Sequence, residues 1–165
     1  MSIRPLRFPA DEAAYHALRR DGLSRQPECF RVTPEDDAER PQRLNGYQPG
    51  GERMLWGAFD GDELMGVVRF ERESLRKLRH KGQIRGLYVR QEAAGQGRGR
   101  QLLRTAVAFA RTLPDLEQVL LNVVASNDRA RGLYLAEGFT VIGREPRALK
   151  WAEQYFDEET LVLFL

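Results

Sequence analysis

A glycine-rich segment near the middle of the chain has the residue types of an anion-binding loop. Gly95, Gly97 and Gly99 follow a β-forming run at 83–90 and precede an amphipathic run that starts near residue 98. Glycine lets the backbone adopt positive φ and approach a ligand closely. Free amides and the dipole of a helix N-terminus attract negative charge. The segment therefore predicts a phosphate or pyrophosphate cradle, with a tight strand-to-helix connection as the plainer alternative.

The spacing of these glycines disfavours two common phosphate-binding motifs. The dinucleotide fingerprint needs Gly-x-Gly-x-x-Gly, whereas residues 95–99 read Gly-x-Gly-x-Gly. A Walker loop needs Gly-Lys followed by Ser or Thr, and that triplet is absent. The anion that this loop binds must therefore belong to another class of ligand.

A second segment combines a helix start, a phenol and a helix stop. Asn127 can cap a short helix, and Gly138 suits the position just after its end. Ala130, Leu133 and Tyr134 share one face of that helix. A phenol has an ordinary pKa of about 10, so Tyr134 can donate a proton at neutral pH. The same position also suits an aromatic ring that only packs in the core.

Together the two segments resemble the GNAT superfamily of N-acetyltransferases. Residues 94–99, Ala-Gly-Gln-Gly-Arg-Gly, correspond to the family's pyrophosphate motif Gln/Arg-x-x-Gly-x-Gly/Ala and depart from it at Ala94. Residues 127–139 match every named position of the signature Asn-x-x-Ala-x-x-Leu-Tyr-x-x-x-Gly-Phe. The resemblance covers nearly the whole chain, and two motifs in the right order are more specific than either alone.

The resemblance implies direct transfer of an acetyl group from acetyl-CoA, as co-substrate, to a primary amine in a ternary complex. It gives Tyr134 the role of general acid toward the coenzyme A thiolate. A backbone amide near Leu87, Tyr88 or Val89 would polarise the thioester carbonyl. No metal is expected, because two histidines and one cysteine offer no ligand spacing. The acetyl-CoA site is expected to comprise Leu87, Tyr88, Val89, Ala94, Gly95, Gln96, Gly97, Arg98, Gly99, Arg100, Asn122, Asn127, Ala130 and Tyr134.

Several polar residues of this set have an alternative explanation. Arg98 and Arg100 oppose the helix dipole unless an anion binds there, and Arg104, one turn further on, could reach the same anion or face water. Asn127 could be only a helix cap. Asn122 interrupts an apolar strand, and a buried amide there needs a partner in the cofactor cleft or a neighbouring loop.

The acceptor side is less defined by the sequence. Glu71 and Glu73 could receive the amine's proton through water, while His80 reads as a loop residue. Arg85 occupies a groove-facing strand position, where it cannot act as a base but could attract an acidic substrate. The resemblance to the GNAT superfamily implies that the amine's entry is lined by Cys29, Phe30, Phe70, Arg85 and Tyr155.

The remaining pattern predicts the elements that must position these residues. Alternation and turn residues predict strands at 3–8, 54–59, 64–72, 83–90, 118–124, 139–145 and 156–165. Helices are expected from residue 11, after Thr33-Pro34, at 98–113 and from 127, with a basic loop at 73–81. The expected fold class is mixed α/β, as one domain over residues 1–165. In the GNAT fold this is a mostly antiparallel sheet of about six to seven strands, splayed at a central parallel pair and flanked by about four helices.

Composition limits the partners. The net charge is only +2 with both signs interspersed, so nucleic acid is not expected as the main partner. The basic run at 76–81 nevertheless keeps a tRNA-directed acetyltransferase as an alternative. Ala94 and the absence of an obvious general base leave a second alternative open. In that alternative the protein binds acyl-CoA as a sensor or scaffold and transfers no acyl group.

Location and assembly are also only expectations. No apolar run approaches the roughly 18 residues of a membrane span, and no secretory signal is visible. A single cysteine, Cys29, permits a reducing cytosol, so a cytoplasmic protein is expected. The apolar strand at 160–165 needs burial on both faces, either within this sheet or against a second subunit of a homodimer.

Overall fold

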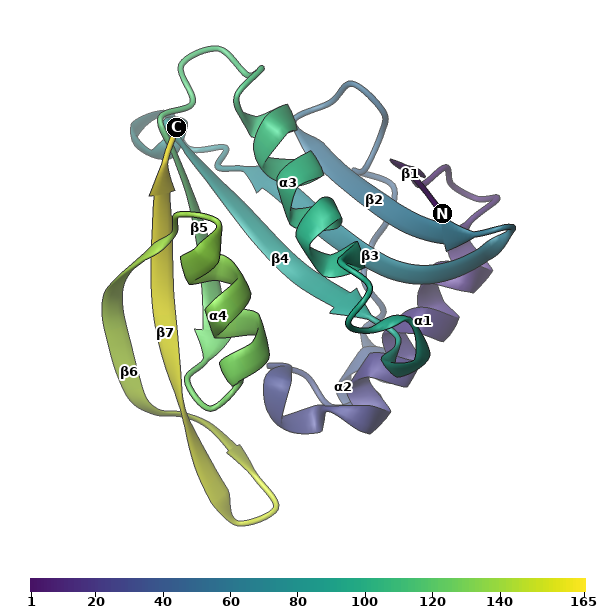
Figure 1. Ribbon diagram of the computed structural model, residues 1–165, viewed down its shortest axis with the longest axis vertical. Helices are drawn as coiled ribbons and strands as arrows, with labels where there is room; N and C mark the ends of the chain where they lie inside the picture. The colour runs from purple at the N-terminus through teal and green to yellow at the C-terminus, as the bar shows by residue number, and fades with distance from the viewer.

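The computed structural model describes residues 1–165 and has the predicted order of elements (Figure 1). Strands and helices alternate along the chain as a mixed α/β fold, which confirms the fold class. The elements are β1 (Ser2–Pro5), α1 (Glu12–Arg25), α2 (Pro34–Glu39), β2 (Arg53–Asp60), β3 (Glu63–Arg72), β4 (Lys81–Val89), α3 (Arg98–Ala110), β5 (Gln118–Val124), α4 (Asp128–Ala136), β6 (Thr140–Trp151) and β7 (Gln154–Phe164).

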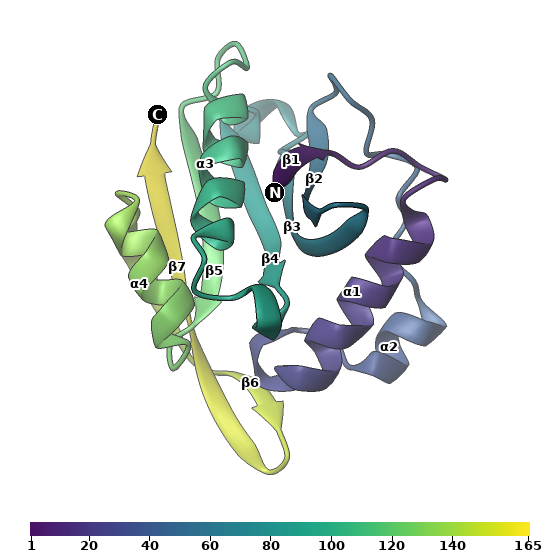
Figure 2. The same cartoon turned by 45° about the vertical axis from the view of Figure 1, so that its right-hand side comes forward.

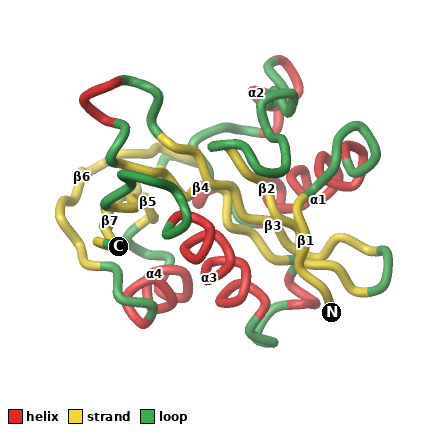
Figure 3. Tube along the Cα trace, turned by 90° about the horizontal axis from the view of Figure 1, so that it is seen from above, coloured by secondary structure: helices red, strands yellow, loops and turns green.

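One seven-stranded sheet runs through the molecule in the order β1-β2-β3-β4-β5-β7-β6. Every neighbouring pair is antiparallel except β4 and β5, which are parallel. These two strands pair only from Lys81 opposite Gln118 to Gln83 opposite Leu120. Beyond these residues the strands diverge, as Figures 1 and 3 show. The expected splay at the central parallel pair is therefore present, and it leaves one edge of the C-terminal half of β4 unpaired.

The helices cover both faces of this sheet (Figure 2). Leu102, Leu103 and Ala106 of α3 are fully buried in one apolar cluster, on the face that α4 also covers. Tyr15 and Leu18 of α1 are buried in a second cluster on the opposite face. Burying one such leucine contributes roughly 1.5–3 kcal/mol. The sheet thus joins two packed layers, and the divergent strands lie between them.

A bulge bends β4 just before its unpaired end. Val67 pairs with Tyr88 and Arg69 pairs with Arg85, so β4 has one more residue than β3 between these pairs. Gly86 lies in the bulge with φ +60°, a conformation that favours glycine. Bulges re-aim the strand that carries them. The bulge therefore sets the direction of Leu87, Tyr88 and Val89.

The helix termini follow the capping residues of the sequence. Asn127 caps α4 by accepting a hydrogen bond from the Ala130 amide at 3.1 Å. Thr33 forms a capping box with Asp36 at the start of α2. Gly138 has φ +91° directly after α4, which confirms its predicted role in ending that helix.

Four predicted boundaries were wrong. β1 ends at Pro5, which has no amide to donate, rather than at residue 8. α3 ends at Ala110 rather than 113, because Thr112 and Leu113 bond three residues back in a tighter turn. The segment 73–81 is not all loop, since Arg76–Leu78 forms a 3₁₀ turn and β4 begins at Lys81.

The fourth difference is the length of the last hairpin. β6 continues to Trp151, and β7 already begins at Gln154. The two strands therefore project from the sheet as a long ribbon (Figure 1). Most of β6 is exposed, so its sequence has no apolar alternation from which the greater length of the strand could be predicted. The apolar β7 lies between β5 and β6, with Leu161 and Val162 buried. This chain's own sheet therefore buries Leu161 and Val162, whereas Phe164 and Leu165 at the end of the run are exposed.

Candidate functional site

The glycine loop has the geometry of an anion-binding turn. Gly95 and Gly97 have φ +79° and +77°, and α3 starts directly after Gly97. The backbone amides of residues 95–100 donate to no backbone acceptor, and no side chain caps this helix end. A row of free amides at a helix N-terminus favours a bound oxyanion. The loop thus fits the phosphate cradle that the glycine spacing predicts.

A cavity of about 370 Å³ opens beside this loop, between β4 and α4. We call it the loop cavity. It is also lined by four residues outside the predicted acetyl-CoA set: Gln26, Ala93, Arg129 and Leu133. The structure brings most of the predicted set together here: Leu87, Tyr88, Val89, Ala94, Gly95, Gly97, Arg98, Gly99, Arg100, Asn127, Ala130 and Tyr134.

Gln96 and Asn122 are the two residues of the predicted set that lie outside the loop cavity. Gln96 is exposed, and its side-chain amide donates to the Glu92 carbonyl at 3.4 Å. Asn122 is not buried as expected but exposed on β5, toward a different cavity. When the side-chain oxygen and nitrogen of Asn122 are exchanged, both find hydrogen-bond partners. The oxygen accepts from Arg31 at 2.9 Å, and the nitrogen donates to Thr160 at 3.3 Å.

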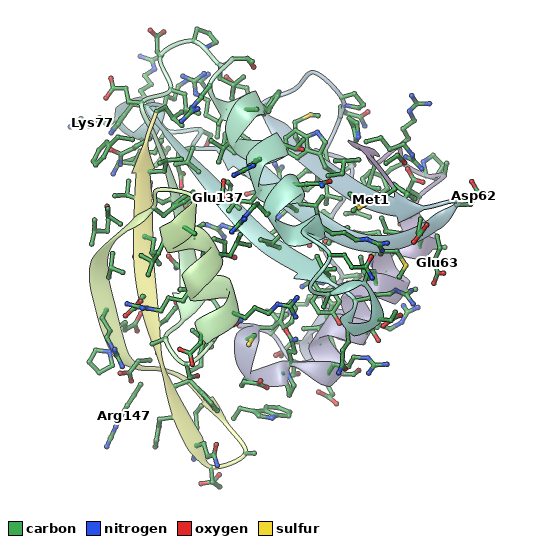
Figure 4. All side chains as sticks on the ribbon, in the orientation of Figure 1. Met1, Asp62, Glu63, Lys77, Glu137 and Arg147 are labelled. Carbon is green, nitrogen blue, oxygen red and sulfur yellow. The ribbon has the colours of Figure 1, made fainter.

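The three arginines of α3 differ in their surroundings. Arg98 is buried and pairs with Asp60 at 2.8 Å, while its Nε and Nη1 have no hydrogen-bond partner. Arg100 and Arg104 both pair with Glu137 at the end of α4, at 3.1 and 2.7 Å. Figure 4 shows Glu137 between α3 and α4. Positive charge is therefore gathered beneath and beside the loop, where a pyrophosphate would fit the donors that the chain leaves unpaired.

The Glu137 carboxylate ties the two helices that border the loop cavity. The hydrogen bond from Arg104 holds the pKa of Glu137 below its usual range. The carboxylate therefore stays ionised at neutral pH and holds Arg100, which lines the cavity, and Arg104, which does not. Because Arg100 and Arg104 are largely exposed, this arrangement leaves donors of both side chains free for a ligand.

Tyr134 lies where the loop cavity meets a second one. The residue is only 6% exposed, and burial raises the pKa of its phenol above the ordinary value of 10. Its ring packs against Phe139, with centroids 6.1 Å apart. The packing and donor roles that the sequence suggested are therefore compatible: the ring belongs to the core, and the hydroxyl stays protonated at neutral pH.

The second cavity, of about 350 Å³, lies on the other side of the splayed strands. We call it the arginine cavity, because Arg19, Arg31, Arg69 and Arg85 line it. It shares six residues with the loop cavity, so the two spaces meet at the divergence of β4 and β5. The shared residues are Gln26, Leu87, Tyr88, Asn127, Ala130 and Tyr134.

The predicted acceptor residues are only partly in this cavity. Cys29, Phe30 and Arg85 line it as expected. Phe70 does not, because it is fully buried in the core cluster beneath α3. Tyr155 does not either, because it is exposed on the β6–β7 ribbon beside Arg147.

Two of the candidate bases also lie elsewhere. Glu71 accepts a hydrogen bond from Tyr47 and lies 3.4 Å from Arg69. Burial alone would raise the pKa of Glu71, but the Tyr47 hydrogen bond and the arginine charges outweigh it and lower the pKa. Neither Glu71 nor Glu73 lines the loop cavity or the arginine cavity, and His80 lies directly before β4, at the far end of the strand from the junction.

The carboxylate that does line the arginine cavity is Glu158. It accepts hydrogen bonds from Arg31, and its side chain is 9% exposed. The sequence did carry a signal for it, since the acidic residues Asp157, Glu158 and Glu159 precede the apolar run of the last strand. A pair of acidic residues in such a strand must find cationic partners, and Arg131 is the partner of Glu159 at 2.7 Å.

Asn127 and Cys29 form a contact between the two halves of the site. The Asn127 amide donates to the Cys29 sulfur at 3.3 Å while its oxygen caps α4. Burial raises the pKa of the Cys29 thiol, so the thiol is neutral at physiological pH. Asn127 thereby holds the segment after α1 against the start of α4.

Other kinds of site are not evident. No group of three or more His, Cys, Asp or Glu residues is arranged to hold a metal ion. Nor does any helix combine the length and the apolar character that a bilayer span requires.

Comparison with known proteins gives the same picture of the fold. The Acetyltransferase (GNAT) family model matches residues 13–139. A ribosomal-protein-alanine N-acetyltransferase from Brucella melitensis superposes with a TM-score of 0.85 at 22% identity, covering 100% of both chains. A phosphinothricin acetyltransferase from Sinorhizobium meliloti, in complex with acetyl-CoA, gives 0.85 at 20% identity over 99% of this chain and 88% of that one.

A putative acetyltransferase from Salmonella typhimurium with its cofactor acetyl-CoA gives a TM-score of 0.80 at 21% identity, covering 100% of this chain and 94% of that one. No match was found among curated proteins.

Proposed function

Since the chain belongs to the GNAT acetyltransferase family, we propose that it transfers the acetyl group of acetyl-CoA directly to a primary amine in a ternary complex. The observation that carries the proposal is the junction of two cavities at the splayed strands. One cavity has the donors for a pyrophosphate, the other is open to a second molecule, and Tyr134 borders both. Such an arrangement lets two substrates meet without water between them.

The loop cavity is proposed to hold acetyl-CoA. The free amides of residues 95–100 would receive the pyrophosphate, with Arg98 and Arg100 supplying positive charge. The unpaired edge of β4 at Leu87, Tyr88 and Val89 would hold the thioester end by backbone hydrogen bonds. Ala94 gives no side chain to the anion, so the backbone amides carry most of this recognition.

The transfer itself needs two proton movements. The neutral amine attacks the thioester carbon, a C–N bond forms and the C–S bond breaks. Tyr134 would donate its phenolic proton to the departing thiolate and recover one later from solvent. The proton lost by the amine would pass to Glu158, through water, because it is the carboxylate of the arginine cavity.

The acceptor is proposed to be a small molecule or a peptide. Two structural neighbours are named for different acceptors, a ribosomal-protein alanine and phosphinothricin. Likeness near 20% identity concerns the fold and does not choose between them. A volume of about 350 Å³ is in the range of small-ligand sites.

Calorimetric titration with acetyl-CoA tests the co-substrate site. We expect micromolar binding by the wild type. Gly97→Asp should abolish it, because the new carboxylate would repel the pyrophosphate at a loop of free amides. Gly97→Ala is the matched control, since it carries the same φ +77° strain without the charge.

The titration is followed by an amine screen that monitors free thiol. Binding with turnover supports the proposed transfer. Binding without turnover of any amine would instead indicate an acyl-CoA sensor. No binding by the wild type would mean that the departure at Ala94 marks a lost site, and the proposed activity would fall with it.

A further inference from the structure

We propose that the amine acceptor is a small amino-acid-like molecule whose carboxylate is bound by Arg85 together with Arg69. This inference rests on the proposed function, because it concerns the second substrate of the same reaction. It names the acceptor's chemistry from the walls of the arginine cavity, where cationic groups outnumber the carboxylate.

Three of the four arginines in the cavity have a carboxylate partner. Arg19 pairs with Asp37 at 2.6 Å, Arg31 is held by Glu158, and Arg69 lies 3.4 Å from Glu71. Arg85 has no ion pair and is exposed to the cavity. The cavity therefore keeps one positive charge that the chain does not balance.

The placement of Arg85 beside Arg69 strengthens the argument. The two residues are directly opposite each other on β4 and β3, and both line the same cavity. Like charges directly opposite on neighbouring strands destabilise a sheet. In addition, the Arg69 Nε is buried and makes no hydrogen bond, although it lies within ion-pair distance, 3.4 Å, of Glu71. An oxyanion between the two guanidinium groups would remove the repulsion and use their free donors.

The pair is also close to the place where transfer would occur. Arg85 precedes the bulge at Gly86, and the next residue, Leu87, borders both cavities. In an α-amino acid the carboxylate and the amine are joined through one carbon. A carboxylate held by Arg85 would therefore direct the adjacent amine toward the junction beside Tyr134.

The other cavity residues do not offer an equivalent site. Arg31 is already bound by Glu158 and Asn122, and Arg19 is the half-buried partner of Asp37. Phe30, Val32, Ile84 and Val123 supply apolar walls for a short side chain. A cavity of about 350 Å³ suits a free amino acid or a close analogue.

The experiment compares matched acceptors under saturating acetyl-CoA. The panel contains the common α-amino acids, their uncharged carboxamides, and the amines that lack the carboxyl group. A dipeptide with an acidic second residue tests whether a side-chain carboxylate can serve instead. We expect kcat/KM for the best amino acid to exceed that of its carboxamide by about 10- to 100-fold, as for a charged hydrogen bond.

Variants at the proposed contact separate charge from geometry. Arg85→Gln should remove the preference for the carboxylate while acetyl-CoA binding, measured by calorimetry, stays unchanged. Arg85→Lys should restore part of it, since the charge remains but the bidentate fork is lost. Arg111→Gln is the matched control, because Arg111 is exposed, unpaired and outside both cavities, and it should keep the full preference.

The possible failures are distinguishable. Equal rates for acids and carboxamides, or a preference that survives in Arg85→Gln, would overturn this inference and leave the transfer reaction standing. A preference for the acidic dipeptide over every free amino acid would overturn the small-molecule acceptor. Transfer to no member of the panel, with acetyl-CoA bound, would overturn the proposed transfer and this inference together.

Discussion

Tyr134 has a ring packed in the core, and the residue also lines both cavities. Burial raises its pKa, so the phenol resists ionisation and keeps the proton that a leaving thiolate needs. A more exposed phenol would be closer to ionisation at high pH. The packed position is therefore compatible with the donor role proposed for Tyr134.

The variant Tyr134→Phe keeps the ring and removes only the hydroxyl. We expect kcat for the proposed transfer to fall by about 10²–10⁴-fold, the usual contribution of a positioned acid, with acetyl-CoA affinity nearly unchanged. Steady-state kinetics and calorimetry on the same preparation measure both quantities. An unchanged kcat would show that the thiolate leaves without a proton from Tyr134.

At the residue scale, the sequence is sufficient to predict the residues of the loop cavity but not those of the arginine cavity. The glycine loop and residues 127–139 are contiguous, so their spacing alone predicts the free amides, the cap at Asn127 and the place of Tyr134. The arginine cavity joins residues from α1, β3, β4 and β7. Its ion pair between Arg31 and Glu158 spans 127 residues along the chain, and no local pattern predicts such a contact.

At the element scale, the bulge in β4 controls how the two sides meet. The bulge depends on Gly86, which has a φ of +60°. A Cβ added at Gly86 would meet no atom of another part of the chain within 4 Å. Any effect of a small substitution there is therefore conformational. The bulge also links Arg85, proposed to bind the acceptor, to Leu87 at the junction of the cavities.

We expect Gly86→Ala to lower the free energy of unfolding by about 1–2 kcal/mol, the cost of a left-handed conformation for a residue with a Cβ. Gly86→Asn should cost less, because asparagine tolerates this conformation. Gly143→Ala is the control, since its Cβ also meets open space but its φ is not positive. Urea denaturation measures all three, and equal losses for Gly86→Ala and Gly143→Ala would contradict the proposed strain.

Elements with an apolar pattern were predicted well, and those without one were not. α3 and β5 bury a regular set of side chains, so their period identifies them. The end of β6 has no such set, because residues 149–151 are held by pairing with β7 and residues 146–151 are mostly exposed. Strand pairing between two polar segments leaves no trace in either sequence taken alone.

At the scale of the whole molecule, the small net charge conceals a dense arrangement of arginine–carboxylate pairs. They connect distant elements, such as Arg31 with Glu158 and Arg131 with Glu159. The basic run at 76–81 takes part as well, since Arg79 pairs with Glu52 at 2.6 Å. Lys77 of this run and Arg147 of the ribbon lie at opposite ends of the molecule (Figure 4). Positive charge is thus dispersed, which argues against a nucleic-acid surface.

These pairs give the protein a predictable response to acid. The hydrogen bond from Arg4 lowers the pKa of Asp11, that from Arg104 lowers the pKa of Glu137, and the Arg147 amide lowers the pKa of Asp157. A carboxylate with a lower pKa in the folded state binds fewer protons there than in the unfolded chain. Its contribution is therefore present above the unfolded pKa, near 4, and is lost as pH falls through the folded value.

We accordingly expect the melting temperature to change little between pH 7 and 5 and to fall steeply below about pH 4. Asp11→Asn should lower the melting temperature at pH 7 and make its decline in acid shallower, because one of the linked protons is removed. Asp115→Asn, at an exposed and unpaired position, should leave the whole profile unchanged. Scanning calorimetry across this range measures the profile. A wild-type melting temperature that stayed constant down to pH 3 would mean that the ion pairs contribute little to folding, and that the sheet and its two apolar clusters hold the divergent strands in place without them.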